Sequence, residues 1–274
     1  MAKKIPYLII PIFIPFGGCD HQCVFCNQVK ITGATYLPGE REIVGTVESY
    51  LSTWKRGGRK EIAFYGGSFT ALPIDVQIDY LEAAYKYVKS GQVDGLRLST
   101  RPDAIDDDTI RLLKKYKVGA VELGVQSMVN KVLKLSGRGH VGKDTVRAVR
   151  LLKEAKIKIG IQLMPGLPGD TESTIISTAR RVIITRPNFV RIYPTVVIKE
   201  TPLHTLYNKG EYIPWTLKDM VSVCRKMYEM FQRSSITIIR MGLQPTKELE
   251  ENIVAGPYHP SFRQLVEGTH KQDI

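Results

Sequence analysis

The stretch that decides the fold is GGCDHQCVFCN, residues 17–27. It follows the apolar segment 8–14 and places Cys19, Cys23 and Cys26 in a C-x3-C-x2-C pattern. A short loop can direct three thiols inward, and the two glycines allow a close approach of the backbone. Three thiolates suit three corners of a four-iron cluster and leave one iron open, which is typical of reactive rather than structural metal sites. The pattern therefore predicts a [4Fe-4S] centre.

A zinc site is the alternative interpretation of the same cysteines. His21 or Cys224 could supply a fourth ligand, but a structural zinc site normally pairs two ligand couples, and no second couple occurs here. We expect Cys224 to face the buried side of its own helix instead. Because the chain has only 4 cysteines, three of them clustered, a disulfide framework is also disfavoured.

Outward from this loop, short apolar segments alternate with segments of helical periodicity. Buried parallel strands are predicted at residues 8–14, 62–65, 96–99, 120–123, 158–163 and 189–193. Helices are predicted at residues 40–54, 75–89, 106–115, 143–154, 171–185 and 216–232.

Six βα repeats without a convincing seventh or eighth strand predict an α/β fold, a partial (β/α)6 TIM-like barrel. A doubly wound sheet is the alternative topology. We expect residues 1–204 to form the barrel core and residues 205–274 a small C-terminal extension packed on it. The apolar run 236–239 falls in that extension.

Composition narrows the class of protein. Hydrophobic residues make up 43% and charged residues 24%, which excludes a disordered or fibrous chain. The longest apolar stretch, residues 7–16, is interrupted by Pro11 and Pro15 and is too short to span a membrane. We therefore expect a cytoplasmic protein with no membrane partner.

The net charge of +12 favours a polyanionic partner such as RNA. Lys143, Arg147 and Arg150 fall on one side of a predicted helix. They contact RNA phosphates if they surround the barrel mouth, and form a solvated face if they do not.

The cysteine motif, with aromatic Phe25 before the last cysteine, resembles that of the radical S-adenosylmethionine (SAM) superfamily. Further motifs agree, one after each of the next four predicted strands: FYGGSFT at 64–70, LSTRPD at 98–103, ELGVQS at 122–127 with GRGH at 137–140, and GIQLMPGLPGD at 160–170. The series most resembles the radical-SAM half of the Elongator catalytic subunit and its bacterial relatives. It is more distantly similar to oxygen-independent coproporphyrinogen oxidase. RIYPTVVI at 191–198 and GPYHPSF at 256–262 extend the resemblance over nearly the whole chain.

The resemblance implies an enzyme in which a [4Fe-4S] cluster on the three cysteines cleaves SAM reductively to a 5'-deoxyadenosyl radical. The side chains and turns that would hold SAM lie at the carboxyl ends of predicted strands, where barrel sites form. They are Phe25, Gly66, Gly67, Ser68, Ser99, Gln126, Arg138 and Gln162.

Some of these residues have a second interpretation. A buried amide needs a hydrogen-bond partner, so Gln162 either meets the ligand or satisfies a neighbour. Arg138 either pairs with the SAM carboxylate or is a solvent-exposed arginine at the start of a helix. We expect Glu122 to form an ion pair with Arg101 across adjacent strand ends.

Two features depart from the Elongator pattern. Ser68 and Ser99 stand where many members of the superfamily, or of the Elongator type, have glutamate. Too few residues follow Pro260 to form an acetyltransferase domain, so we expect this polypeptide to lack one.

The leading functional prediction is modification of a transfer RNA nucleoside, with electrons from a flavodoxin- or ferredoxin-like donor. A radical SAM enzyme acting on a small metabolite or peptide is the second hypothesis. An iron–sulfur RNA-binding protein without turnover is the third. The sequence assigns no catalytic residue on the substrate side.

Overall fold

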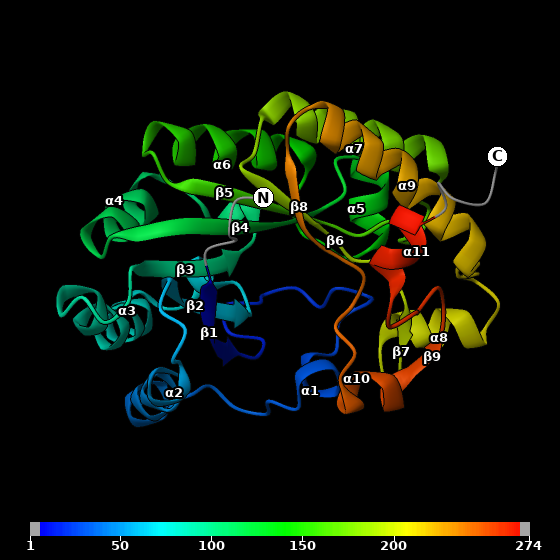
Figure 1. Cartoon of the computed structure of the whole chain (residues 1–274). Helices are drawn as coiled ribbons and strands as arrows, with labels where there is room; N and C mark the ends of the chain where they lie inside the picture. The colour runs from blue at the N-terminus through cyan, green and yellow to red at the C-terminus, as the bar shows by residue number, and fades with distance from the viewer. Residues whose placement is uncertain (1–5, 269–274) are drawn as a thin grey trace.

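One curved sheet of seven parallel strands dominates the computed structural model, which describes residues 6–268 (Figure 1). The strands follow one another in sequence order across the sheet, and this confirms the partial TIM-like barrel and excludes the doubly wound alternative. Their bounds are β1 Tyr7–Ile14, β2 Arg59–Gly66, β3 Gly95–Thr100, β4 Val118–Gln126, β5 Lys158–Leu163, β6 Phe189–Ile192 and β8 Thr237–Met241.

The seventh strand corrects the strand number, which the sequence predicts as six. The apolar run 236–239 contributes to β8, which pairs in parallel with β6 and places Ile238 opposite Val190. Its run of apolar residues is short, and without a partner such a segment cannot be distinguished from a buried loop. The preceding helix covers it and turns it into one more βα repeat.

Six long helices cover the convex side of the sheet, and each lies close to its predicted bounds (Figure 1). Side chains cap three of their N-termini: Asp106 accepts a hydrogen bond from Thr109 N at 2.8 Å, Thr171 accepts one from Thr174 N at 3.2 Å, and Thr216 accepts one from Asp219 N at 3.1 Å. The helices are α2 Glu40–Thr53, α3 Ile74–Lys89, α4 Asp107–Lys115, α6 Gly142–Glu154, α7 Glu172–Thr185 and α9 Leu217–Arg233. No helix in residues 6–268 is long and apolar enough to cross a membrane.

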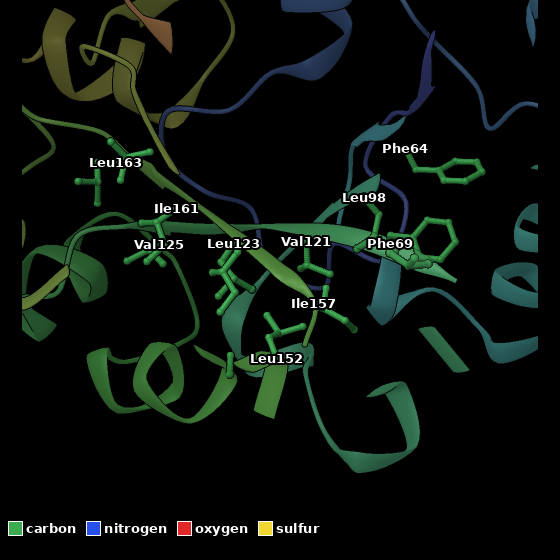
Figure 2. Close-up of a cluster of buried hydrophobic side chains, with 14 of the residues drawn as sticks. Phe64, Phe69, Leu98, Val121, Leu123, Val125, Leu152, Ile157, Ile161 and Leu163 are labelled. Atoms are coloured by element: carbon green, nitrogen blue, oxygen red, sulfur yellow. The ribbon is translucent and has the colours of Figure 1, made fainter. Parts of the chain in front are cut away.

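Side chains alternate between the two faces of each strand. On the convex face, apolar residues such as Phe64, Leu98, Leu123 and Ile161 are fully buried and form the main core with the helices (Figure 2). The concave face carries polar and aromatic side chains instead. The sheet thus packs one face against the helices and keeps polar side chains on the other.

Short elements complete the described chain, and the last of them, α11, packs on α9 and β8. Among them, α1 and α10 lie side by side, and β7 pairs antiparallel with β9 (Figure 1). Their bounds are α1 Gln28–Thr32, α5 Asn130–Leu135, β7 Val197–Ile198, α8 Pro202–Asn208, α10 Lys247–Asn252, β9 Ile253–Ala255 and α11 Phe262–Gly268. The later elements therefore reach back to the segment that follows the cysteines.

Candidate active site

The cysteine loop, residues 17–27, lies at the carboxyl end of β1, as predicted. Val24 holds it from two sides: its N–H donates to Ser136 O at 3.1 Å, and its carbonyl accepts from Leu203 N at 2.8 Å. Phe25 packs beside Val24 on the cluster formed by Val197, Leu203 and Tyr212. Phe25 therefore has a packing role in the structure.

The three thiols of the cysteine loop are free and half-buried. Burial raises the pKa of Cys26 to about 12, and the neighbouring Cys23 and Cys19 add to the effect. Burial and Cys23 also raise the pKa of Cys19, while hydrogen bonding to Ser68 and the charge of Arg101 oppose the rise. The thiols thus interact with one another, and a bound metal would displace their protons.

The three thiols of one short loop are the donors that a four-iron cluster takes. Such a cluster takes one thiolate at each of three separate irons. Cys224 is fully buried in the core on α9, so it is not a fourth ligand.

The glycine turn after β2 packs directly on the cysteine loop. Ser68 N donates to Gly17 O at 2.7 Å. A Cβ atom on Gly67 would lie 2.1 Å from Gly17 O, and one on Gly18, whose φ is +66°, would lie 2.3 Å from Ser68 O. Only glycine allows this contact of backbone with backbone, and it fixes where the cysteines begin. Gly66 also has a positive φ, of 105°, and completes the turn.

Arg138 is buried, with 6% of its surface exposed, so the interpretation as a solvent-exposed arginine is wrong. Its Nη1 donates to Cys23 Sγ at 3.2 Å, and its Nη2 donates to Gly124 O. The flanking Gly137 and Gly139 both have positive φ, and the turn they make directs the guanidinium toward the cysteine loop.

Three of the predicted ligand positions carry buried polar atoms that have no partner in the described structure: Ser99 Oγ, Gln126 Oε1 and Arg138 Nε. Gln126 also has a φ of +64°, which is unusual for a residue with a side chain, and it follows an irregularity in the pairing of β4 with β5. Buried polar atoms almost always have partners. These atoms lie at or beyond the ends of β3 and β4 and fit a polar, zwitterionic ligand such as SAM.

Gln162 already has a partner on the concave face. Its Nε2 lies 3.4 Å from Glu122 Oε2. The predicted pairing of Glu122 with Arg101 is wrong. Arg101 follows β3 and turns toward the cysteine loop, where it pairs with Asp20 at 3.3 Å and with Asp103 at 3.1 Å.

Glu122 instead is fully buried in a network that the sequence did not predict. It pairs with Arg97 at 3.0 Å and with Arg191 at 2.6 Å, and it accepts a hydrogen bond from Tyr65 Oη at 2.9 Å. Burial by itself would raise the pKa of Glu122, but the two arginines hold it below its ordinary value. Arg97 also pairs with Glu61 at 2.8 Å. In the sequence, the sign of this buried network is the presence of charged residues within otherwise apolar strands.

His140 is a second residue that the sequence did not assign. It is 3% exposed, and its ring lies beside the backbone of Val125 and Arg138. Burial and the nearby charge of Arg138 lower its pKa to about 4, so the ring is neutral at pH 7. His140 is therefore a buried neutral imidazole beside Arg138.

Comparison with known proteins identifies two family domains in the chain. The radical SAM superfamily matches residues 13–182, and the radical SAM C-terminal domain matches residues 187–272. Together the two matches include all seven strands except the first part of β1.

Named relatives include archaeal, bacterial and yeast proteins. The chain is 33% identical over 256 residues to a tRNA uridine(34) acetyltransferase of Methanocaldococcus infernus. This match covers 78% of this chain and 48% of that protein. It is 30% identical over 224 residues to an uncharacterised protein of Methanocaldococcus jannaschii. This match covers 77% of this chain and 69% of that protein. The chain thus spans about half the length of the acetyltransferase.

The same architecture occurs in a solved structure. The archaeal Methanocaldococcus infernus Elp3 superposes with a TM-score of 0.75 at 23% identity, over 97% of this chain and 63% of that chain. This similarity supports the curled parallel half-barrel as the fold.

Proposed function

The chain belongs to the radical SAM superfamily, and from this membership we propose that it modifies a transfer RNA nucleoside by radical chemistry. Enzymes of this superfamily use a [4Fe-4S] cluster and SAM. When bound, the cluster supplies the electron that cleaves SAM to methionine and a 5'-deoxyadenosyl radical. One observation carries the proposal. The cysteine loop and several buried polar atoms without partners lie together at the carboxyl ends of the strands.

We assign Cys19, Cys23 and Cys26 as the ligands of three irons. The backbone contact between the two glycine turns supports this assignment, because it holds the start of the loop rigidly against β2. Val24 fixes the middle of the loop through its two backbone hydrogen bonds. A loop held at both points loses little freedom when it takes up the cluster, and this favours binding.

We assign the SAM contacts to the carboxyl ends of β2, β3 and β4. Gly66 and Gly67 would present backbone groups at the end of β2, and Ser68, whose backbone groups already bond to Gly17 and Ala71, would hold that turn in place. Ser99 and Gln126 offer an unpaired hydroxyl and an unpaired amide oxygen, and Arg138 offers an unpaired Nε–H suited to a carboxylate. Phe25 and Gln162, which already have protein partners, would contribute less.

The concave face provides the reaction chamber. Its interior charges are neutralised within the protein, because Glu122 pairs with Arg97 and Arg191. A 5'-deoxyadenosyl radical takes hydrogen atoms rather than protons, so the role of these ion pairs is to hold the polar lining in place. The network also fixes Tyr65, whose hydroxyl donates to Glu122. The substrate would be held beside this fixed lining.

Two features support tRNA as the substrate. One is the similarity to tRNA uridine(34) acetyltransferases, and the other is a row of exposed basic residues on α6, Lys143, Arg147 and Arg150. α6 begins at the carboxyl end of the sheet, and Arg147 Nη2 lies 3.4 Å from Asp103 O in the loop after β3. Phosphate groups at the barrel mouth would meet these side chains. A flavodoxin- or ferredoxin-like protein is the proposed electron donor.

Anaerobic turnover tests the enzymatic part of this proposal. The reconstituted chain, given SAM and dithionite, should release 5'-deoxyadenosine, and a Cys23→Ala variant should not. Cys224→Ala is the matched control and should retain the activity, because Cys224 lies in the core of α9. Absence of 5'-deoxyadenosine from a fully loaded chain would contradict the proposal.

A second experiment tests the substrate. Nucleosides from the tRNA of cells that lack the protein are compared by mass spectrometry with those of complemented cells. One modified nucleoside should disappear and return with the wild-type chain but not with Cys23→Ala. An unchanged tRNA profile, together with 5'-deoxyadenosine formation, would direct the activity to a small metabolite or peptide instead.

A further inference from the structure

Two buried arginines contact the cysteine loop from two different strand ends. Arg138, in the segment after β4, lies 3.2 Å from Cys23 Sγ. Arg101, directly after β3, lies 3.3 Å from the carboxylate of Asp20, the residue that follows Cys19. A guanidinium therefore lies close to each of the first two cysteines of the motif.

Neither of the two arginines has hydrogen-bond partners for all of its N–H groups. Arg138 is 6% exposed and Arg101 is 7% exposed, and each has a buried N–H group without a partner: Nε in Arg138 and Nη1 in Arg101. Arg101 pairs with Asp103 and Asp20, whereas in residues 6–268 no carboxylate lies within salt-bridge distance of Arg138. A buried cation without a counter-charge is costly. Cys23 Sγ, to which its Nη1 donates, supplies a negative charge once the thiol is ionised.

The anchoring of Arg138 explains how it stays in this position. Its Nη2 donates to Gly124 O in β4, so the guanidinium is fixed to the sheet while Nη1 points to the sulfur. Hydrogen bonds to ligand sulfurs and the net charge of the surroundings are the main protein features that set the potential of an iron–sulfur cluster. Arg138 contributes both features, and Arg101 contributes charge.

We propose that Arg138 and Arg101 are positioning residues that raise the reduction potential of a cluster held by Cys19, Cys23 and Cys26. Reduction adds one electron, and hence one negative charge, without forming or breaking a bond. The electron comes from an external one-electron donor of the flavodoxin or ferredoxin class, or from dithionite in vitro. Positive charge beside the sulfurs stabilises the added charge. The inference rests on the proposed function only in that these cysteines hold the cluster.

The two arginines should differ in how much they raise the reduction potential of the cluster. Arg138 acts directly on Cys23 Sγ and has no carboxylate partner. Arg101 acts through Asp20 and is partly neutralised by Asp103, so its effect should be smaller. Asp20 has the opposite sign, and its removal should raise the potential slightly, because its side chain is 67% exposed and screened by water.

The test is a redox titration of the reconstituted full chain in the absence of SAM. Electron paramagnetic resonance measures the reduced cluster at each solution potential. Omitting SAM separates this role from binding of the SAM carboxylate. At a fixed solution potential, Arg138→Gln should lower the ratio of reduced to oxidised cluster about tenfold, or about 59 mV for a one-electron couple. Arg101→Gln should lower the ratio less, and Asp20→Asn should raise it. Arg138→Lys should restore part of the loss.

Arg233→Gln is the matched control, because its side chain on α9 is 81% exposed and the substitution removes the same charge. Its ratio should equal that of the wild type. Iron and sulfide per chain are measured first, and if Arg138→Gln loads poorly, Arg138→Lys and Asp20→Asn decide the test. Unchanged ratios in loaded variants, or shifts of the same sign for Arg101→Gln and Asp20→Asn, would overturn the inference. A wild-type chain that holds no cluster would instead refute the proposed function.

Discussion

Arg191 Nε in β6 donates to Glu122 Oε2 in β4 over 2.6 Å and so joins two strands that are not neighbours in the sheet. Arg97 in β3 and Tyr65 in β2 reach the other oxygen of the same carboxylate. Gln162 in β5 also donates to this carboxylate, so that one buried group ties five strands of the half-barrel together. This explains how an open sheet can keep a polar concave face without exposing it fully to water.

Replacing this carboxylate should destabilise the chain strongly. Glu122→Gln leaves Arg97 and Arg191 without their shared counter-charge, and breaking a buried ion pair on one side costs about 3–5 kcal/mol. Urea unfolding of the cluster-free chain measures the loss. Glu154→Gln is the control: it removes an exposed pair with Arg150 at 3.8 Å and should cost no more than about 0.5 kcal/mol. Equal losses in the two variants would contradict the structural role of Glu122.

Removing the unpaired hydroxyl of Ser99 should separate stability from binding. Ser99→Ala loses no hydrogen bond in the free chain, so the free energy of unfolding should stay the same or rise. SAM affinity should fall about 5- to 10-fold, as expected for the loss of one hydrogen bond of about 1 kcal/mol.

Ser127→Ala is the contrasting variant for this prediction. The Ser127 hydroxyl is buried and accepts a hydrogen bond from Val129 N at 3.1 Å, so its removal should cost about 1 kcal/mol of stability. Isothermal titration with SAM and urea unfolding give the two readouts. A Ser99→Ala variant that is destabilised like Ser127→Ala and binds SAM normally would remove Ser99 from the site.

The contact between glycine turns should tolerate no side chain. Gly67→Ala places a Cβ atom 2.1 Å from Gly17 O, so the start of the cysteine loop must shift and the uptake of iron should fall several-fold. Gly45→Ala in α2 meets nothing within 4 Å and should stabilise the chain by about 0.5–1 kcal/mol. Iron and sulfide per chain after anaerobic reconstitution, with urea unfolding, compare the two variants. Normal iron content in Gly67→Ala would show that the turn does not position the cysteines.

His140 should make stability depend on pH. Its pKa is about 4 in the folded chain, against 6.5 as the ordinary value, so the unfolded chain binds the proton more readily. Above pH 6.5 the contribution of His140 to the free energy of unfolding does not change with pH. As the pH falls from 6.5 toward 4, the free energy of unfolding decreases by up to about 3 kcal/mol. Urea unfolding at pH 7 and pH 5 should therefore show a smaller pH effect for His140→Gln than for the wild type. His204→Gln, at a partly exposed position on α8, should keep the wild-type dependence.

The order of strands and helices was predictable because it depends on local patterns. β5 has its predicted bounds, and the six long helices begin and end close to theirs. The seventh strand was not predictable with the same certainty. Thr237–Met241 becomes a strand only because β6 offers an unpaired edge beside it and α9 covers it. Pairing of this kind is a property of the assembled sheet.

The candidate site divides in the same way. The spacing of the cysteines and the glycine turns are visible in the sequence, since a short loop and a tight turn are built from adjacent residues. The partners of Glu122 are not visible there, because Arg97 and Arg191 approach it from separate strands. The burial of Arg138 and its contact with Cys23, more than one hundred positions earlier in the chain, likewise required the folded chain.

The sequence by itself determined the alternation of strands and helices, the three-cysteine loop and the glycine turns, because each arises from interactions between neighbours in the chain. Tertiary structure decided which charges meet. Coulomb attraction and hydrogen bonding act over a few ångströms, and only the curvature of the sheet brings Arg97, Glu122 and Arg191 within that range, or sets Arg138 and Arg101 beside the cysteines.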